Sequence, residues 1–410
     1  MSSALGWIDY DAKNREHTRN LLAMFSEEES RDELGIGAIR DSIADALFPG
    51  TSTIQTRLKY MLFVPWIYMS LEEKRIRSPK FGQKADEMER DLIDVILKSD
   101  DTEGAFGRVS GRNIKRLPSS VYWSGLGSWG IRRIKMSQRQ YHERIDEIYK
   151  AADEKEKGDA VEPSYSWHKG IPTPPEGFPK RAEFALRSDE ALFLRDRIVE
   201  THPNSLLAFL AGECQLADIE NVTFVWENPC FHRFSEENKN KRLLHHARNF
   251  SEMIFGAVIA YNYYLSKHRF EKKRWEDDEH LAEEYREIFF DWFESLRRDE
   301  LLDWELDEFW TILENSEHTI TDATKRFIKD WISMALNSRN VEGVLDSSQT
   351  EGLIQNREKK LKKGKSRFQN DKALEQWGGQ SGMAQLDYRW GKVKVLLTDL
   401  YKGLEGSTYA

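Results

Sequence analysis

Eight cations occur in a stretch of 39 residues that contains no acidic residue, from Gly104 to His142. These cations are Arg108, Arg112, Lys115, Arg116, Arg132, Arg133, Lys135 and Arg139. The whole chain is acidic, with a formal net charge of -9, so this basic block reverses the sign of the charge locally. Such a reversal indicates a surface that contacts nucleic acid, an acidic partner, or an acidic stretch of the same chain. One such stretch runs from Glu276 to Glu308, where fifteen acidic residues outnumber three arginines and the net charge is -12.

The centre of the basic block, 119–133, combines aromatic rings with glycines and is flanked by cations. Trp123 and Trp129 are expected to stack on the bases of single-stranded nucleic acid, while the flanking cations contact its phosphates. These cations are Arg112, Lys115, Arg116, Arg132 and Arg133. Two other interpretations stay open. The segment is either a glycine-rich turn with buried tryptophans and solvated cations, or a face that docks on the acidic stretch.

A second candidate site lies in residues 36–71, where the pattern predicts a helix, a short turn and another helix. The first helix covers 39–47 and ends at Phe48-Pro49-Gly50, and a hydroxyl from 51–53 caps the second, which starts at Ile54. Its first turns would present polar side chains to phosphates and base edges, as in a helix-turn-helix. The predicted nucleic-acid-binding residues are Ser52, Gln55, Thr56, Arg57 and Lys59. The alternative is a structural hairpin, and Pro65 should kink or end the second helix.

Catalytic motifs are missing from the sequence. No glycine-rich phosphate loop ends in Lys-Ser/Thr, so ATP use is not expected. No cysteines have the spacing of a zinc site, and Cys214 with Cys230 alone cannot form one, so we expect no metal and no cofactor. The segment 241–252 groups His245 and His246 with Arg242, Arg248 and Glu252, which could support acid/base chemistry, although a hydrogen-bonded structural histidine is the simpler interpretation.

Helical periodicity dominates the chain and predicts a mainly α, multi-helix globular protein with few short strands. The best strand candidate is Val222–Trp226, which is β-branched and aromatic. Helices are predicted over 11–25, 86–97, 138–149, 251–265, 281–296, 324–336 and 393–404.

Composition shifts divide the chain into five parts. Five prolines in 152–180 predict a linker, which aromatic residues could hold against a domain. A second linker is predicted at 337–372, with a basic run from Arg357 to Arg367 on a loop that could also contact nucleic acid. The expected organisation is a helical domain at 1–151, the linker 152–180, a helical domain at 181–336, the linker 337–372 and a helical segment at 373–410.

Bulk properties favour a folded protein in a reducing compartment. Aromatic residues make up 12% of the chain, with 13 tryptophans, which argues against disorder. Two cysteines in 410 residues fit the cytoplasm better than a secreted fold. The first residues do not have the pattern of a secretory signal. The densest apolar segment, Met253–Leu265, is too short to cross a bilayer. We therefore expect a soluble, cytoplasmic protein that does not enter a membrane.

Four blocks resemble a bacterial family known only as a domain of unknown function. They are LGWIDYD at Leu5–Asp11, the segment Asp32–Tyr68 that contains DELGIGAIRD and FPGTSTIQTR, SSVYWSGLGSWGI at Ser119–Ile131, and the closing Leu386–Leu404. The resemblance carries no catalytic motif. It implies genes in mobile or phage-defence clusters, next to helicases and phospholipase-D-type nucleases.

Three functional hypotheses follow. The preferred one is a non-catalytic accessory subunit of a bacterial nucleic-acid-targeting defence complex, which contacts DNA or RNA through its N-terminal basic surface. Helicase or nuclease partners would then supply catalysis. The alternatives are a nuclease without a recognisable motif, and a protein-binding scaffold that does not contact nucleic acid.

Overall fold

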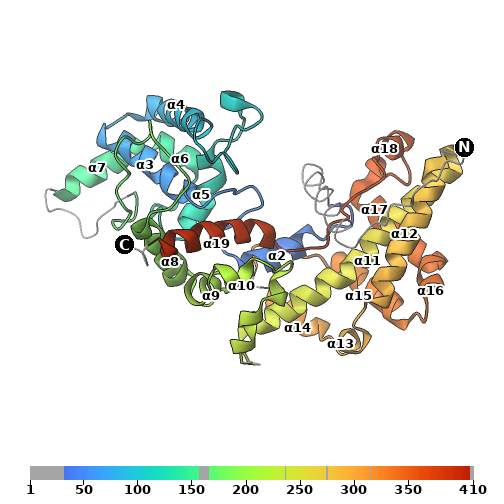
Figure 1. Cartoon of the computed structure of the whole chain (residues 1–410). Helices are drawn as coiled ribbons and strands as arrows, with labels where there is room; N and C mark the ends of the chain where they lie inside the picture. The colour runs from blue at the N-terminus through green and yellow to red at the C-terminus, as the bar shows by residue number, and fades with distance from the viewer. Residues whose placement is uncertain (1–31, 157–165, 236, 274–275, 315, 407–410) are drawn as a thin grey trace, which may run out of the picture. The chain divides into compact units, whose positions relative to one another are not determined.

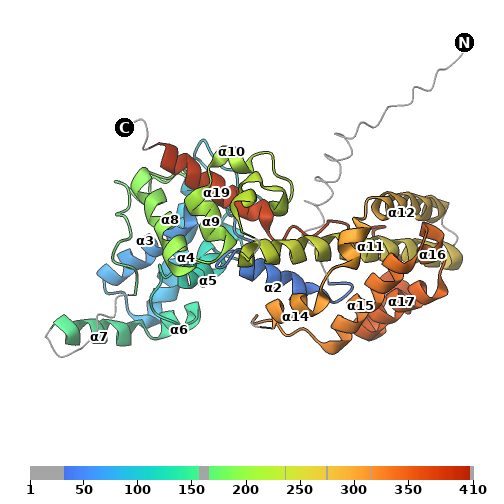
Figure 2. The same cartoon turned by 90° about the horizontal axis from the view of Figure 1, so that it is seen from below.

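The computed structural model describes residues 32–156, 166–235, 237–273, 276–314 and 316–406. It confirms a mainly helical, multi-helix fold, with 65% of the described residues in helices (Figures 1 and 2). Over the described ranges no strand forms, and an isolated β-bridge joins Arg132 and Trp167. The contacts divide the chain into two compact units that interleave in the sequence. Unit 1 comprises Met1–Ile43 and Leu243–Tyr388, and unit 2 comprises Ala44–Arg242 and Arg389–Ala410.

Unit 1 is built around the long helix α11. Its elements are α2 (Gly37–Leu47, shared with unit 2), α11 (Lys239–Lys273, whose first residues belong to unit 2), α12 (Glu276–Glu294), α13 (Arg298–Leu302), α14 (Leu306–Leu313), α15 (Asp322–Asn337), α16 (Val341–Leu345), α17 (Ser348–Lys362), η4 (Lys363–Lys365) and α18 (Asp371–Glu375). Gly256 lets α12 approach α11, because a Cβ there would overlap the Trp292 indole ring. Figures 1 and 2 show the two helices side by side. From α15, Trp331 donates a hydrogen bond to the Met253 carbonyl at 2.8 Å, so buried indoles join three helices.

Unit 2 is built around α3, in which ten of the fourteen residues are buried. Its further elements are α4 (Ser78–Ile96), η1 (Gly111–Asn113), α5 (Pro118–Ser128), α6 (Gln138–Glu143), α7 (Ile145–Glu156), α8 (Ser188–Thr201), α9 (Leu206–Glu213), α10 (Leu216–Ile219), η2 (Val225–Glu227), η3 (Pro229–Arg233) and α19 (Trp390–Glu405), and α3 itself spans Tyr60–Glu73. Helices α4 and α5 pack on α3, and α8, α9 and α10 pack on α19. A helix that is apolar on nearly all sides must be buried on nearly all sides, which explains the central place of α3.

Most helices that the periodicity predicts are confirmed, in α4, α11, α12, α15 and α19. The helix predicted over 138–149 is divided between α6 and α7 at Arg144, and Ser137 begins α6 with a capping box to Gln140. Helix α3 continues through Pro65 to Glu73, so the proline does not end it. The helix predicted over 11–25 and the LGWIDYD block lie outside the described residues.

The predicted strand at Val222–Trp226 is wrong. Residues 225–227 form the 3-10 helix η2. The Val222 carbonyl accepts hydrogen bonds from the Trp390 indole at 3.2 Å and the Lys394 ammonium at 3.0 Å. The β-branched residues therefore fill space next to α19, and no neighbouring strand is present in the described part of the chain to pair with them.

The described part of the proline-rich segment, 166–180, is not helical. Its aromatic residues pack it against the helices of unit 2, as the sequence indicated they could. Trp167 is buried, and the Phe178 ring stacks on Phe63 with centroids 5.7 Å apart. The other predicted linker, 337–372, contains α16, α17 and α18. Most of the basic run therefore lies on α17 and η4 rather than on a loop. Polar groups of unit 1 pair with several of its cations.

None of the described helices has the length and apolar character that crossing a bilayer requires.

Candidate nucleic-acid interface

The polar residues predicted to start a second helix lie instead in an irregular connection, 48–59, between α2 and α3. The prediction of a helix from Ile54 is therefore wrong. The Tyr122 hydroxyl accepts hydrogen bonds from the backbone N–H groups of Thr56 and Arg57, at 2.8 and 3.1 Å. Because distant side chains satisfy these backbone groups, the connection needs no helical hydrogen bonds.

Three of the predicted contact residues in the connection point their polar atoms into the protein. Gln55 is 1% exposed. Its amide donates to the Gly50 carbonyl at 3.1 Å, and its oxygen accepts from the Ser52 backbone at 3.2 Å. The hydroxyl oxygens of Ser52 and Thr56 are buried. The apolar Ile54 side chain is 43% exposed instead. None of the three polar side chains can therefore contact a nucleic acid as predicted.

Arg57 is neutralised within unit 2. Its guanidinium contacts the Asp399 carboxylate at 3.0 Å and the Asp101 carboxylate at 2.8 Å. Burial disfavours the charged guanidinium, but these two carboxylates outweigh burial and raise the pKa of Arg57 above its usual value. Burial also raises the pKa of Asp399, against the opposing effect of Arg57. The Arg57 side chain is a structural tie to α19, which the sequence could not indicate.

Lys59 forms a buried ion pair with Glu190 at the start of α8. Their side chains are 3% and 0% exposed. The Lys59 ammonium also donates to the Ala185 carbonyl at 2.9 Å. Burial lowers the pKa of Lys59, although Glu190 opposes this effect. The prediction that Lys59 faces solvent is wrong, because the ammonium and the carboxylate share a site that excludes water.

The two tryptophans of the basic block are core residues, so the prediction that they stack on bases is wrong. Trp123 and Trp129 are 7% and 1% exposed. The Trp123 indole donates to the Met136 carbonyl and the Trp129 indole to the Pro49 carbonyl, both at 2.9 Å. Polar partners for the indole N–H groups allow both rings to be buried. The interpretation as buried rings is the correct one.

Two arginines of the basic block are also occupied by the protein. Arg112 forms ion pairs with Asp91 and Asp94 of α4. Arg132 lies over the Trp123 ring, 4.8 Å from its centroid, and donates to the Ile134 carbonyl. Burial lowers the pKa of Arg132. Arg112 is exposed but its guanidinium is paired with two carboxylates, and Arg132 is directed to protein partners.

Three predicted residues, Lys115, Arg116 and Arg133, are exposed, as are Arg108 and Lys135 of the same block. None of the five forms an ion pair with a carboxylate of the described residues, whereas Arg139 pairs with Glu143. Of the predicted nucleic-acid-binding cations, therefore, Lys115, Arg116 and Arg133 are both exposed and without a carboxylate partner among the described residues. Arg108, Lys115 and Arg116 lie in the same connection between α4 and α5.

We call residues 107–116 the basic loop. Its conformation is fixed at its base, where Arg90 of α4 donates to the carbonyls of Arg112 and Ile114. Gly107 has a φ of 76° and a Cβ there would overlap the Gly111 carbonyl, so glycine is required at this turn. Val109 is fully exposed at 102%. The loop therefore projects Arg108, Lys115 and Arg116 into solvent from a constrained base.

A buried carboxylate anchors the far end of the connection. Glu89 of α4 is 0% exposed and accepts a hydrogen bond from the Ser119 backbone, in the first turn of α5, at 2.7 Å. Burial raises the pKa of Glu89 to about 7, although the hydrogen bond from Ser119 opposes the shift. The contact holds the start of α5 against α4. It thereby fixes the position at which the connection between the two helices ends.

His245 and His246 lie on the part of α11 that belongs to unit 1. The His246 side chain has a structural role. That side chain is 2% exposed, accepts from the Trp304 indole at 2.8 Å through Nδ1, and faces Glu308 at 3.3 Å through Nε2. His245 is exposed and contacts the Asn249 amide at 3.1 Å. Glu252 pairs with Arg248 at 2.8 Å. These contacts are those of a hydrogen-bonded structural histidine at His246.

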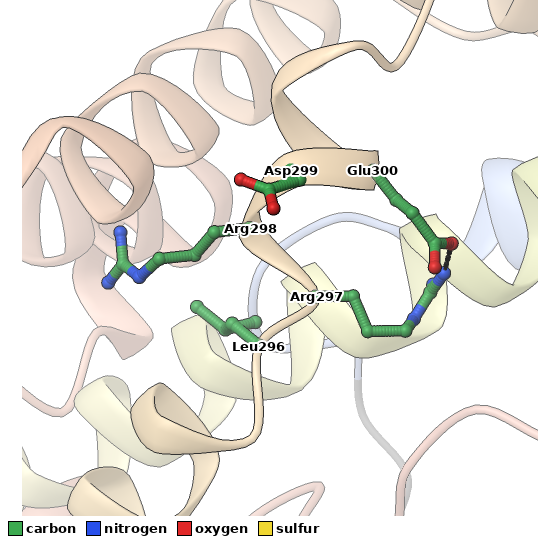
Figure 3. A pocket seen from close by; sticks show the side chains of 5 residues that line it. All are labelled: Leu296, Arg297, Arg298, Asp299 and Glu300. Atoms are coloured by element: carbon green, nitrogen blue, oxygen red, sulfur yellow. Dashed lines mark hydrogen bonds and ion pairs between the residues drawn. The ribbon is translucent and has the colours of Figure 1, made fainter.

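An open hollow of about 400 Å³ lies after α12, lined by Leu296, Arg297, Arg298, Asp299 and Glu300 (Figure 3). Figure 3 shows the side chains of Arg297 and Arg298 pointing in opposite directions. Arg297 pairs with Glu300 and with Glu252, and Arg298 donates to the Leu336 carbonyl at 3.0 Å. Both guanidiniums are directed to protein partners and do not converge on the hollow.

The basic run on α17 and η4 is also partly internal. Arg357 donates to the Leu34 carbonyl and the Thr324 hydroxyl, each at 2.8 Å. Arg367 pairs with Glu33 at 2.9 Å. The exposed cations of the run are Lys360, Lys363 and Lys365. The run therefore holds unit 1 together as well as presenting charge.

The structure brings together three groups that the sequence did not connect. Cys214, Asp218 and Cys230 place their thiol and carboxylate atoms within 4.8 Å of one another. The sequence places Cys214 and Asp218 four residues apart, which is a possible ligand spacing. Fifteen residues separate Cys214 from Cys230, so the sequence did not indicate that the second thiol joins them. No other group of three such side chains at this spacing occurs among the residues that the structure describes.

Comparison with protein families matches residues 1–403 to a family of unknown function, DUF6361. The chain belongs to this family. No curated protein and no solved structure matches the chain. The family confirms that the chain is one of unknown function, as the four sequence blocks implied, and assigns neither a reaction nor a ligand.

Proposed function

We propose that this protein is a non-catalytic accessory subunit that contacts the phosphate backbone of DNA or RNA through the basic loop. The observation that carries the proposal is the exposure of Arg108, Lys115 and Arg116. They are held on a constrained loop, without a carboxylate partner among the described residues. Elsewhere in unit 2, Arg57 and Lys59 are paired internally, and within the loop Arg112 is paired with Asp91 and Asp94 of α4. A loop whose base is fixed loses less conformational entropy when it binds.

The chemistry of the loop favours phosphates over bases. Trp123 and Trp129 are buried, so these rings do not supply the stacking that single-strand recognition uses. Arginine and lysine contacts with phosphates are independent of sequence and release counterions. The proposed binding is therefore weak, sequence-independent and dependent on salt.

The partners follow from the same proposal. The resemblance implies neighbouring helicase and nuclease genes in phage-defence clusters. The sequence has no phosphate-binding ATPase loop. We therefore place the chain in a cytoplasmic antiviral defence complex in which partner proteins supply ATP hydrolysis and cleavage. The basic loop then adds affinity for the nucleic acid.

The test is fluorescence anisotropy with labelled single-stranded DNA, duplex DNA and RNA over a salt series. Three phosphate contacts predict a slope of about -2.7 for log affinity against log salt on duplex DNA, a loss of roughly 40-fold between about 50 and 200 mM. The variant Arg108→Glu/Lys115→Glu/Arg116→Glu should abolish binding at low salt.

The control is Lys74→Glu/Lys80→Glu/Lys180→Glu, which changes the net charge equally at exposed lysines of unit 2. It should retain most of the affinity. Absence of binding by the wild type at low salt, or equal losses in the two variants, would contradict the proposal. Absence of binding would favour the protein-binding scaffold.

A further inference from the structure

Both cysteines of the chain meet at one place in unit 2, together with a carboxylate. Cys214 follows the last residue of α9, Asp218 lies in α10, and Cys230 lies in η3. Their candidate ligand atoms lie within 4.8 Å of one another. Cys230 is buried, and Cys214 is half-buried. Two thiols separated by fifteen residues become neighbours only because the chain between them folds back.

Hydrogen bonds fix the backbone at Cys230 and Asp218 and orient the Asp218 carboxylate. The buried Asn228 side chain accepts from the Cys230 backbone at 2.8 Å and donates to the Asp218 carbonyl at 3.1 Å. One Asp218 carboxylate oxygen accepts from the Gln215 backbone at 2.9 Å, which leaves the other oxygen available to a ligand. Metal-binding side chains are commonly oriented by such outer hydrogen bonds.

The geometry is close to that of a tetrahedral metal site. A Zn–S distance of about 2.3 Å and tetrahedral angles place two thiolate sulfurs about 3.8 Å apart. The two sulfurs lie within 4.8 Å of each other, so their separation would need to close by about 1 Å at most. Two thiolates and a carboxylate carry three negative charges, which a divalent cation and the neighbouring Arg233 guanidinium would balance.

We propose that Cys214, Asp218 and Cys230 bind a Zn²⁺ ion, with the fourth coordination position open. Sulfur ligands favour zinc over Mg²⁺ and Ca²⁺, which prefer oxygen. The site ties the end of α9 to α10 and η3, so the ion stabilises this part of unit 2. It does not depend on the basic loop, and its test is independent of nucleic-acid binding.

The experiment uses the full chain, reduced and stripped with a chelator, and titrated with Zn²⁺ in competition with a chromophoric chelator. Cobalt is a second probe, because two thiolates give a sulfur-to-cobalt charge-transfer band. We expect stoichiometric Zn²⁺, the cobalt band, and a higher melting temperature with metal. Asn228→Ala should weaken zinc affinity by roughly 10- to 100-fold, and Cys214→Ser should abolish the cobalt band.

Asp218→Asn is the decisive variant, because asparagine keeps the acceptor for the Gln215 backbone and removes the ligand charge. It should fold as the wild type does and lose more zinc affinity than Asn228→Ala. The exposed Asp196→Asn is its control. Failure of the reduced wild type to take up either metal would overturn the proposal, whether or not its thiols form a disulfide in air. Equal affinity in Asp218→Asn and Asp196→Asn would overturn it too.

Discussion

The connection 48–59 and the basic loop 107–116 both join helices of unit 2, and both carry cations that we predicted to contact nucleic acid. In the connection, Arg57 and Lys59 turn inward to Asp399 and Glu190, which lie 342 and 131 positions away in the sequence. In the basic loop, Lys115 and Arg116 stay exposed. The comparison shows that a cation is available to a ligand only where no distant carboxylate reaches it.

The largest difference between the two regions is expected from Lys59→Ala. It removes the buried cation from the Glu190 carboxylate, whose remaining ion-pair partner is the half-exposed Arg187 at 3.4 Å, and loss of one member of a buried pair costs about 3–5 kcal/mol. Urea unfolding followed by tryptophan fluorescence measures the change. The double variant Lys59→Met/Glu190→Gln, which keeps the acceptor for the Arg187 backbone, should recover most of the stability. Equal stability of wild type and Lys59→Ala would show that the pair is not buried in solution.

The next largest effect concerns Glu89, which anchors α5 beside the basic loop. Burial raises its pKa to about 7 in the folded protein. As the pH rises, the Glu89 carboxyl therefore ionises at a lower pH in the unfolded chain than in the folded one. This group therefore stabilises the fold below its unfolded pKa of about 4.3, and the contribution is lost as the pH rises to about 7, by roughly 3 kcal/mol.

Unfolding measurements between pH 5 and 8 test this sign. Glu89→Gln stays neutral throughout, so it should gain stability relative to the wild type as the pH rises. Glu87→Gln, at a half-buried position on the same helix that pairs with Lys84, should show no such divergence. A wild type that parallels Glu89→Gln over the whole range would refute the raised pKa.

The smallest effect on stability is expected from the triple charge reversal in the basic loop. Surface substitutions away from buried partners usually change the free energy of unfolding by about 0.5 kcal/mol or less. The same variant should nevertheless lose nucleic-acid binding. Thermal melting beside the anisotropy measurement separates the two effects. Strong destabilisation would mean that the loop cations are structural, like those of the connection.

Much of the fold could be predicted because the apolar spacing that indicates a helix lies within a short stretch of sequence. Apolar spacing located α4, α15 and α19 well. It failed at Val222–Trp226, where β-branched residues pack beside α19 instead of pairing as a strand. It also failed at Ile54, because the Tyr122 hydroxyl satisfies backbone groups that a helix would otherwise use. Both failures arise from partners that are remote in the sequence.

The candidate site was predictable only in part. The absence of acidic residues identified the block that contains Lys115 and Arg116 correctly as a region of local positive charge. The same pattern could not distinguish these side chains from Arg112, which Asp91 and Asp94 of a preceding helix neutralise. Nor could alternating aromatic and basic residues show that Trp123 and Trp129 are buried.

The sequence by itself determined the helical class and the sign of the charge on the basic block, because these properties depend on residue type and on spacing within a few turns. The tertiary structure alone decided which cations face solvent and that Cys214, Asp218 and Cys230 meet. Ion pairing and metal coordination require atoms within a few ångströms, and chain folding sets those distances independently of separation in the sequence.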